Sequence, residues 1–285
     1  MKRVPEAQPP AAERVPAAQP PGGRPVPAAR IPGARRLLSA GSPVLAAVCA
    51  LAAWWLATDV FDIRPFLLPA PPDVVDAFTR LPGYLLRQTW QTFTETAVGF
   101  GLAVGAGLVT AVLLTASRGV ERAVMPLLVA VNAVPKIAVA PLLVVWLGFG
   151  AAPKVFMVAL LAWFPVVVST MAGLTSVPLE LTELAHSLTA SRWQTYRKLR
   201  IPWALPQVFT GLRLGVTLAV VGAVVGEFAG GDQGLGYVIV ASGGNADTPL
   251  AFAAMALLSA MSVLLFYAVV LAERALLPWA RETTG

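Results

Sequence analysis

Long apolar stretches alternate with short polar segments along most of this chain. A helix needs about 20 mostly apolar residues to cross the hydrocarbon core of a bilayer. The pattern therefore predicts an all-α polytopic membrane protein with about six transmembrane helices. The third stretch contains Pro126, Pro135 and Pro141, so we expect a kinked helix that faces protein or a water-filled path. The predicted spans are Leu37–Thr58, Thr92–Ser117, Ala123–Gly148, Lys154–Leu174, Ala204–Phe228 and Pro249–Ala272.

Both ends of the chain are predicted to lie outside the bilayer. Residues 1–36 are rich in proline and alanine and show no apolar periodicity, which is typical of a disordered tail. No convincing small-residue cleavage site follows the first apolar stretch, so we expect an uncleaved helix at 37–58 rather than a signal peptide. Residues 276–285 form a short C-terminal tail.

The polar segment at residues 59–91 separates the first two predicted spans, and we expect it at the outer surface. It should contain a short amphipathic helix that Asp73 caps, with Val74, Val75 and Phe78 on one face. Three prolines should stop any helix before that point: Pro69, Pro71 and Pro72.

The charge distribution predicts an orientation. Hydrophobic residues make up 57% of the 285 and charged residues only 13%, against about 25% charged residues in soluble domains. Placing the N-terminus inside puts fifteen lysines and arginines on the cytoplasmic side and four, including Lys154, on the other. The positive-inside rule then places both termini and residues 180–206 in the cytoplasm. The net charge of +6 is spread over short loops, which argues against nucleic-acid binding.

Several kinds of chemistry are excluded by composition. One cysteine, Cys49, and one histidine, His186, are too few for a zinc or iron–sulfur site, so we expect no metal and no cofactor. The same two residues offer no plausible nucleophile–base pair for an intramembrane enzyme, so we expect no catalytic residues. The sequence also has no G-x-x-x-x-G-K-[ST] phosphate-binding loop. If ATP drives this protein, another polypeptide hydrolyses it.

The segment from Glu180 to Pro206 is polar and basic between apolar runs. Pro178 can start a helix in which apolar residues recur at helical spacing, and Ser191 with Gln194 forms a capping box for a second short helix. Ile201-Pro202 should end that second helix. Two interpretations are open, a knob that docks on a cytoplasmic partner and an amphipathic helix lying in the membrane interface. The apolar face comprises Leu181, Leu184, Ala185 and Leu188.

This segment resembles the EAA loop of bacterial ABC-importer permeases, which docks on the ATPase subunit. Leu184 stands in place of the middle alanine of that motif, and Thr189 stands where glycine is usual, which puts the turn geometry in question because glycine permits a positive φ. The residues that the resemblance assigns to the ATPase-coupling loop are Glu183, Ala185, Thr189, Ala190, Ser191, Pro202 and Pro206.

Further stretches are similar to permeases of the nitrate/sulfonate/taurine type over Pro69 to Trp279. They include Trp146-Leu-Gly-Phe-Gly150 and the glycine-rich run that follows Glu227. Glu95 and the run Thr248-Pro-Leu-Ala-Phe look most like permeases for thiamine-precursor pyrimidines. The resemblance implies the type I ABC-importer fold, with an ABC transmembrane type-1 domain at 88–275. It also implies a homodimer in the bacterial inner membrane, two ABC ATPase subunits and an extracytoplasmic binding protein that delivers a small polar solute.

Three charged residues inside the predicted spans are candidates for the translocation path: Glu95, Lys136 and Glu227. Intramembrane charges usually face a bundle interior or water. The two glutamates could instead lie shallow enough to reach headgroup water. They also allow an alternative function, a proton-coupled secondary transporter, although the sequence shows no internal repeat of the kind such folds carry. Close helix contacts are expected at Gly101-x-x-x-Gly105, Gly211-x-x-x-Gly215 and Gly222-x-x-x-Gly226.

Overall fold

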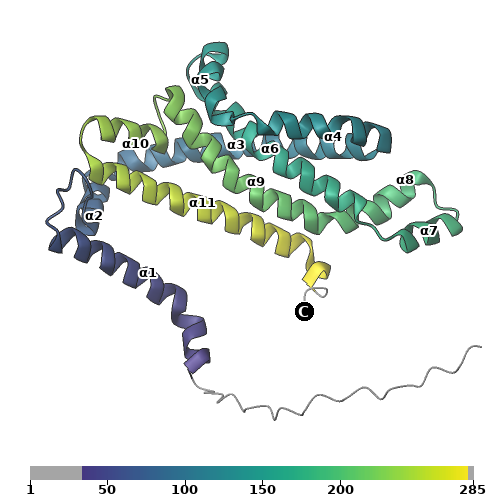
Figure 1. Cartoon of the computed structure of the whole chain (residues 1–285), viewed down its shortest axis with the longest axis horizontal. Helices are drawn as coiled ribbons and strands as arrows, with labels where there is room; N and C mark the ends of the chain where they lie inside the picture. Colours follow the sequence, from purple (N-terminus) through teal and green to yellow (C-terminus); the bar gives the residue numbers. More distant parts are fainter. Residues whose placement is uncertain (1–33, 282–285) are drawn as a thin grey trace, which may run out of the picture. The chain divides into compact units, whose positions relative to one another are not determined.

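The computed structural model describes residues 34–281, and every regular element within that range is a helix (Figure 1). Residues 1–33 of the expected N-terminal tail and the last four residues of the C-terminal tail lie outside the described residues, and the last three residues of the expected N-terminal tail belong to α1. The last part of α1, from Ala50, belongs to one unit with the later helices, and residues up to Cys49 belong to another. The elements are α1 (Ala34–Val60), α2 (Pro71–Arg80), α3 (Pro82–Thr115), α4 (Arg118–Ala133), α5 (Lys136–Leu147), α6 (Ala151–Thr175), α7 (Leu179–Ser187), α8 (Arg192–Thr195), the π-helix η1 (Tyr196–Arg200), α9 (Ile201–Gly230), α10 (Leu235–Gly244), α11 (Thr248–Leu276) and the 3₁₀ helix η2 (Pro278–Arg281).

Four helices in the described part of the chain are long and apolar enough to cross a membrane: α3, α6, α9 with the turns that precede it, and α11. The pair α4 and α5 passes the same test as one broken span, bent by 85°. The break falls at Val134 and Pro135, because proline has no N–H and disfavours helical geometry in the residue before it. The predicted kink is thus confirmed. The first predicted span falls within α1, whose residues Leu45–Val60 form a shorter apolar helix.

Helix α6 packs against both α3 and α9. Val158 of α6 is fully buried between Gly99 of α3 and Gly222 of α9: a Cβ on Gly99 would lie 2.5 Å from the Val158 Cβ, and one on Gly222 would lie 2.8 Å from the Val158 Cα. About two turns further along α6, Val166 lies in the same way between Gly107 and Gly215. The absence of side chains at these glycines therefore allows three backbones to approach closely.

The glycines that make these contacts differ in part from those the sequence suggested. Gly211, Gly215, Gly222 and Gly226 of α9 do face α6 at close range, as expected. On α3, however, Gly101 and its partner four residues on have open space where a Cβ would be. That prediction was wrong because the face of α3 that packs on α6 carries Gly99 and Gly107 instead.

The segment at residues 59–91 departs from its prediction at both ends. Helix α2 begins at Pro71 rather than after the prolines, since proline is tolerated in a first helical turn. Asp73 does cap the helix, but from its third position, where its Oδ2 accepts the Ala70 N–H at 3.0 Å. Val74 is buried, whereas Val75 is 59% exposed and so does not share its face. Helix α3 then starts at Pro82, ten residues before the predicted Thr92.

Candidate functional site

The loop between α6 and α9 is a helix–turn–helix built on local hydrogen bonds. Pro178 precedes α7, as predicted. At the end of α7 the Ala190 N–H donates to the Ala185 carbonyl, and the Thr189 N–H donates to the His186 carbonyl, each at 3.0 Å. This pair of bonds is the Schellman arrangement, which needs a left-handed residue after the helix. Thr189 supplies it with φ 57°, so threonine adopts the geometry that glycine would have taken.

The second arm of the loop begins as predicted and ends differently. Ser191 Oγ accepts the Gln194 N–H at 3.2 Å and Gln194 Oε1 accepts the Ser191 N–H at 2.9 Å, which confirms the capping box. Pro202 does not end the helix: α8 continues through η1 into α9. The π-turn explains this difference. The Ile201 N–H bonds the Tyr196 carbonyl, five residues back, just where Pro202 can donate no bond of its own.

The predicted apolar face of this loop is not covered by the chain. Leu184 is 56% exposed and Leu188 is 71% exposed, while Ala185 is half-buried. Trp193 of the second arm is also exposed, and the basic residues Arg197 and Lys198 are exposed beside it. The loop therefore presents apolar side chains next to positive charge at the end of the bundle opposite to α10 (Figure 1).

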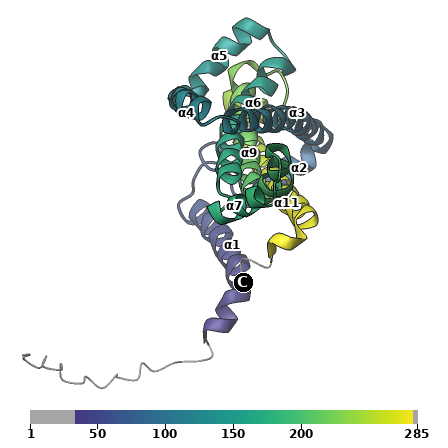
Figure 2. The same cartoon turned by 90° about the vertical axis from the view of Figure 1, so that its right-hand side faces the viewer.

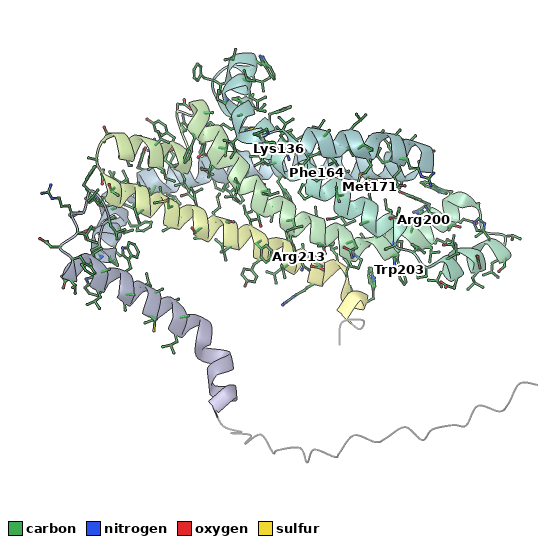
Figure 3. The ribbon with its side chains drawn as sticks, in the orientation of Figure 1. Lys136, Phe164, Met171, Arg200, Trp203 and Arg213 are labelled. Atoms are coloured by element: carbon green, nitrogen blue, oxygen red, sulfur yellow. The ribbon has the colours of Figure 1, made fainter. Side chains whose placement is uncertain are left out.

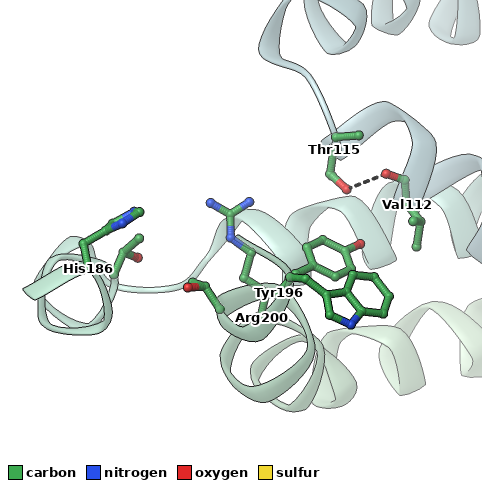
Figure 4. A pocket seen from close by; sticks show the side chains of 9 residues that line it. Val112, Thr115, His186, Tyr196 and Arg200 are labelled. Carbon is green, nitrogen blue, oxygen red and sulfur yellow. Dashed lines mark hydrogen bonds between the residues drawn. The ribbon is translucent and has the colours of Figure 1, made fainter. Parts of the chain in front are cut away.

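A cavity of about 540 Å³ separates this loop from the end of α3. Figure 4 shows that His186, Tyr196 and Arg200 line it from the loop side, facing Val112 and Thr115 of α3. The position of the loop is thus set by its covalent connections to α6 and α9, since the cavity keeps it from packing closely on the end of α3.

A second group of polar residues is buried where α3, α6, α9 and α10 meet. The Lys154 amine lies 3.0 Å from Glu95 Oε1, and the two side chains are 2% and 3% exposed. The same amine donates to the Gln233 carbonyl at 3.0 Å, and Gln91 Nε2 donates to Glu95 Oε1 at 2.8 Å. Lys154, which the sequence analysis counted among the charges of the outer side, is therefore buried in this cluster and not exposed at a surface.

Glu227 belongs to the same cluster and binds the start of α10. Its Oε1 accepts the Thr92 hydroxyl at 2.7 Å and its Oε2 accepts the Gly236 N–H at 2.5 Å. The Leu235 N–H donates to Thr92 Oγ1 at 2.8 Å, and the Gly234 N–H donates to Gln88 Oε1 at 2.6 Å. Three successive amides at a helix start, which have no partners within the helix, are thus satisfied by buried side chains.

The structure brings Glu95 and Glu227 together in one cluster, where protein rather than headgroup water surrounds them. Sequence analysis missed the contributions of Gln88, Thr92 and Lys154. A signal was available on α3, since Gln88, Thr92 and Glu95 recur at i, i+4 and i+7 and so form a polar stripe on an otherwise apolar helix.

Lys136, the third candidate for the path, makes its contacts elsewhere. It begins α5, its amine donates to Asn132 Oδ1 at 2.5 Å, and it lies 5.7 Å from the ring centre of Phe164 (Figure 3). It also lines a hollow of about 410 Å³ whose other walls are apolar. Figure 2, which views the bundle from its α7 end, shows α5 projecting from it.

Comparisons with known proteins agree with this architecture. Residues 103–282 match the family model described as the binding-protein-dependent transport system inner membrane component. The chain is 37% identical over 241 residues to the riboflavin transport system permease protein RibX of Chloroflexus aurantiacus, covering 84% of this chain and 90% of that one. It is 35% identical over 256 residues to the formylaminopyrimidine transport permease protein ThiX of Halalkalibacterium halodurans, covering 87% and 99%.

A further relative and one solved structure extend the likeness. The chain is 29% identical over 239 residues to the taurine transport system permease protein TauC of Escherichia coli, covering 81% of this chain and 87% of that one. A chain from the inward-facing MetNI methionine ABC transporter superposes with a TM-score of 0.61 at 22% identity, covering 69% of this chain and 97% of that one. This last match shows that the two chains share a fold.

Proposed function

Because this chain belongs to the family of binding-protein-dependent transport system inner membrane components, we propose that its α6–α9 loop couples it to a separate ATPase subunit. The chain is a membrane-embedded permease subunit of an ATP-binding-cassette importer. That membership removes the proton-coupled secondary transporter as an alternative. We place the domain responsible at residues 88–275.

The exposed apolar surface of the α6–α9 loop carries this proposal. No part of the described chain packs over the exposed side chains of Leu184 and Leu188. The Schellman turn at Thr189 fixes the angle between α7 and the second arm of the loop. That arm continues as one helix from Trp193 to Gly230. A displacement of the loop by a bound ATPase would therefore be transmitted along α9 toward Glu227 and the start of α10.

The assembly that we propose contains two copies of this chain, two ATPases and an extracytoplasmic binding protein. The α6–α9 loop and both termini lie in the cytoplasm, and α2 and α10 lie on the outer side. The distribution of basic residues supports this orientation, and moving Lys154 into the buried cluster leaves three basic residues on the outer side instead of four. A reporter fused near Gly243 should be accessible from outside, and one near Ser191 should not.

The relatives are named for the transport of riboflavin, formylaminopyrimidine and taurine. We infer that the solute transported here is likewise a small polar molecule. Of the three candidate residues, we keep Lys136 for the path. We assign Glu227 to fixing the start of α10, because it accepts the Gly236 N–H, and Glu95 to holding the Lys154 amine, which donates to the Gln233 carbonyl just before α10.

A co-purification experiment tests the coupling loop. The permease is co-expressed with the ATPase subunit of its transporter, and ATPase retained per permease is measured. Leu188→Asp places a charge on the exposed surface of the loop and should reduce retention at least about tenfold, the equivalent of ~1.4 kcal/mol of binding. Val75→Asp is the matched control, since Val75 is similarly exposed but lies on α2. Equal retention by both variants would refute the coupling role.

A further inference from the structure

The cavity between the α6–α9 loop and α3 lies at the edge of the hydrocarbon region of the bilayer. No charged residue occurs between Glu95 and Arg118, and the apolar part of α3 runs up to its last residue, Thr115. An apolar stretch of about 20 residues crosses the hydrocarbon core. Thr115 and the following Ala116 both line the cavity. The cavity is therefore at the level where lipid headgroups meet the protein.

The wall of the cavity that the loop contributes is basic. Arg200 of η1 and His186 of α7 line it, and no carboxylate of the described residues does (Figure 4). The Arg200 side chain is partly buried, and its guanidinium has no hydrogen-bond or ion-pair partner among the residues that the structure describes. A guanidinium binds phosphate oxygens through paired N–H donors. Arg200 thus has its donors free for a phosphate group in the cavity.

The wall that α3 contributes leads to a surface that faces lipid. Val112 lines the cavity and is 40% exposed, and Trp193, an aromatic residue of the kind enriched at membrane interfaces, lines it from the loop. One face of α3 carries exposed apolar side chains at helical spacing up to this point: Val98, Leu102, Val109 and Leu113. This stripe extends about 22 Å along α3, which exceeds half the thickness of the hydrocarbon core and so accommodates an acyl chain.

We propose that the cavity binds the headgroup of an anionic phospholipid, with the phosphate at Arg200 and an acyl chain along the exposed stripe of α3. The volume of about 540 Å³ lies within the range of small-molecule pockets. Basic pockets beside membrane spans are typical binding sites for anionic headgroups. The bound lipid fills the gap between the loop and α3. This site goes beyond the coupling role proposed above, because the lipid binds whether or not an ATPase is present.

Native mass spectrometry of the full chain in detergent measures this binding. Delipidated protein is titrated with phosphatidylglycerol and, separately, with zwitterionic phosphatidylcholine, and a Kd is obtained for each lipid. Phosphatidylglycerol should bind more tightly. Arg200→Gln should weaken its binding by about fivefold, the effect of one basic residue on an anionic lipid, and should change phosphatidylcholine binding little.

Two further variants separate this site from general attraction between basic residues and lipid. Arg197→Gln is the matched control, because Arg197 is exposed on the same π-helix and does not line the cavity, so its effect should be clearly smaller. Ala116→Trp fills the cavity from an exposed position, leaves the charges unchanged and should also weaken phosphatidylglycerol binding. Equal losses in the two arginine variants, unchanged binding in Ala116→Trp, or equal affinity for the two lipids would overturn the proposal.

A competition experiment distinguishes a lipid headgroup from a soluble phosphate compound. Glycerol phosphate carries the same phosphate without acyl chains, so it should fail to displace phosphatidylglycerol even in large excess. Displacement that Arg200→Gln abolishes would show that the site holds a soluble phosphate compound, and the proposal would fail. These titrations need no ATPase, so their failure leaves the co-purification test of the coupling loop unaffected.

Discussion

The Lys154 amine and the Glu95 carboxylate, 59 residues apart in the sequence, lie 3.0 Å apart with both side chains almost completely buried. Removing one partner from a buried pair leaves an uncompensated charge, which costs about 3–5 kcal/mol. Lys154→Met should therefore lower the free energy of unfolding by that order, measured by denaturant titration in mixed micelles.

Two controls accompany this measurement. Arg80 and Asp247 form an ion pair at 3.6 Å that is largely exposed, so Arg80→Ala should cost only about 0–1 kcal/mol. The double variant Lys154→Met with Glu95→Leu removes both charges and should be less destabilised than Lys154→Met alone. If Lys154→Met costs no more than Arg80→Ala, the buried pair does not hold the helices together.

The bonds from Glu227 to Thr92 and Gly236 predict that α10 is fastened by this carboxylate. Glu227→Ala leaves the buried Gly236 amide without its acceptor, a cost of about 1–3 kcal/mol, and leaves the Thr92 hydroxyl only the Gln88 carbonyl at 3.2 Å. Amide hydrogen exchange in α10 should then accelerate by at least about tenfold, while exchange in α11 changes little. Asp232→Asn is the control, because Asp232 is exposed in the same loop. Unchanged exchange in α10 would contradict the role assigned to Glu227.

Gly222 and Gly101 allow a matched test of the helix packing. A Cβ on Gly222 would lie 2.8 Å from the Val158 Cα, whereas a Cβ on Gly101 would meet no atom within 4 Å. Gly222→Ala should overpack the α6–α9 contact and destabilise the protein by about 1–3 kcal/mol. Gly101→Ala should be neutral or stabilising by up to about 1 kcal/mol, since alanine favours the helix. Equal effects on the unfolding midpoint would refute the packing that we describe.

Features set by the local chain could be predicted from the sequence. The break at Pro135 and the capping box at Ser191 depend on backbone chemistry within a few residues. The partner of Lys154 could not be predicted, because periodicity shows which residues are polar but not which distant helix they meet. In the same way, Gly99 and Gly101 both lie in the apolar stretch of α3, and the sequence does not show which of them faces another helix. The position of α6 decides that Gly99 makes the close contact. The resemblance to permeases located the loop, yet its turn geometry was left open by Thr189.

Thr189 holds a left-handed conformation, φ 57°, that costs an L-residue with a branched Cβ roughly 1–2 kcal/mol. Glycine carries no such cost but gains entropy in the unfolded chain, which offsets about 0.5–1 kcal/mol of the benefit. Thr189→Gly should thus tighten the turn modestly. The Ala190 amide, bonded to the Ala185 carbonyl, should exchange up to about fivefold more slowly, the equivalent of ~1 kcal/mol.

Thr189→Val keeps the branched Cβ but loses the Oγ1 bond to the Leu188 carbonyl, so its Ala190 amide should exchange faster. Retention of the ATPase should follow the same order, with the glycine variant at least equal to the parent, because docking benefits from a turn held in one geometry. Faster exchange in the glycine variant would mean that the threonine side chain, rather than the backbone conformation, stabilises the turn.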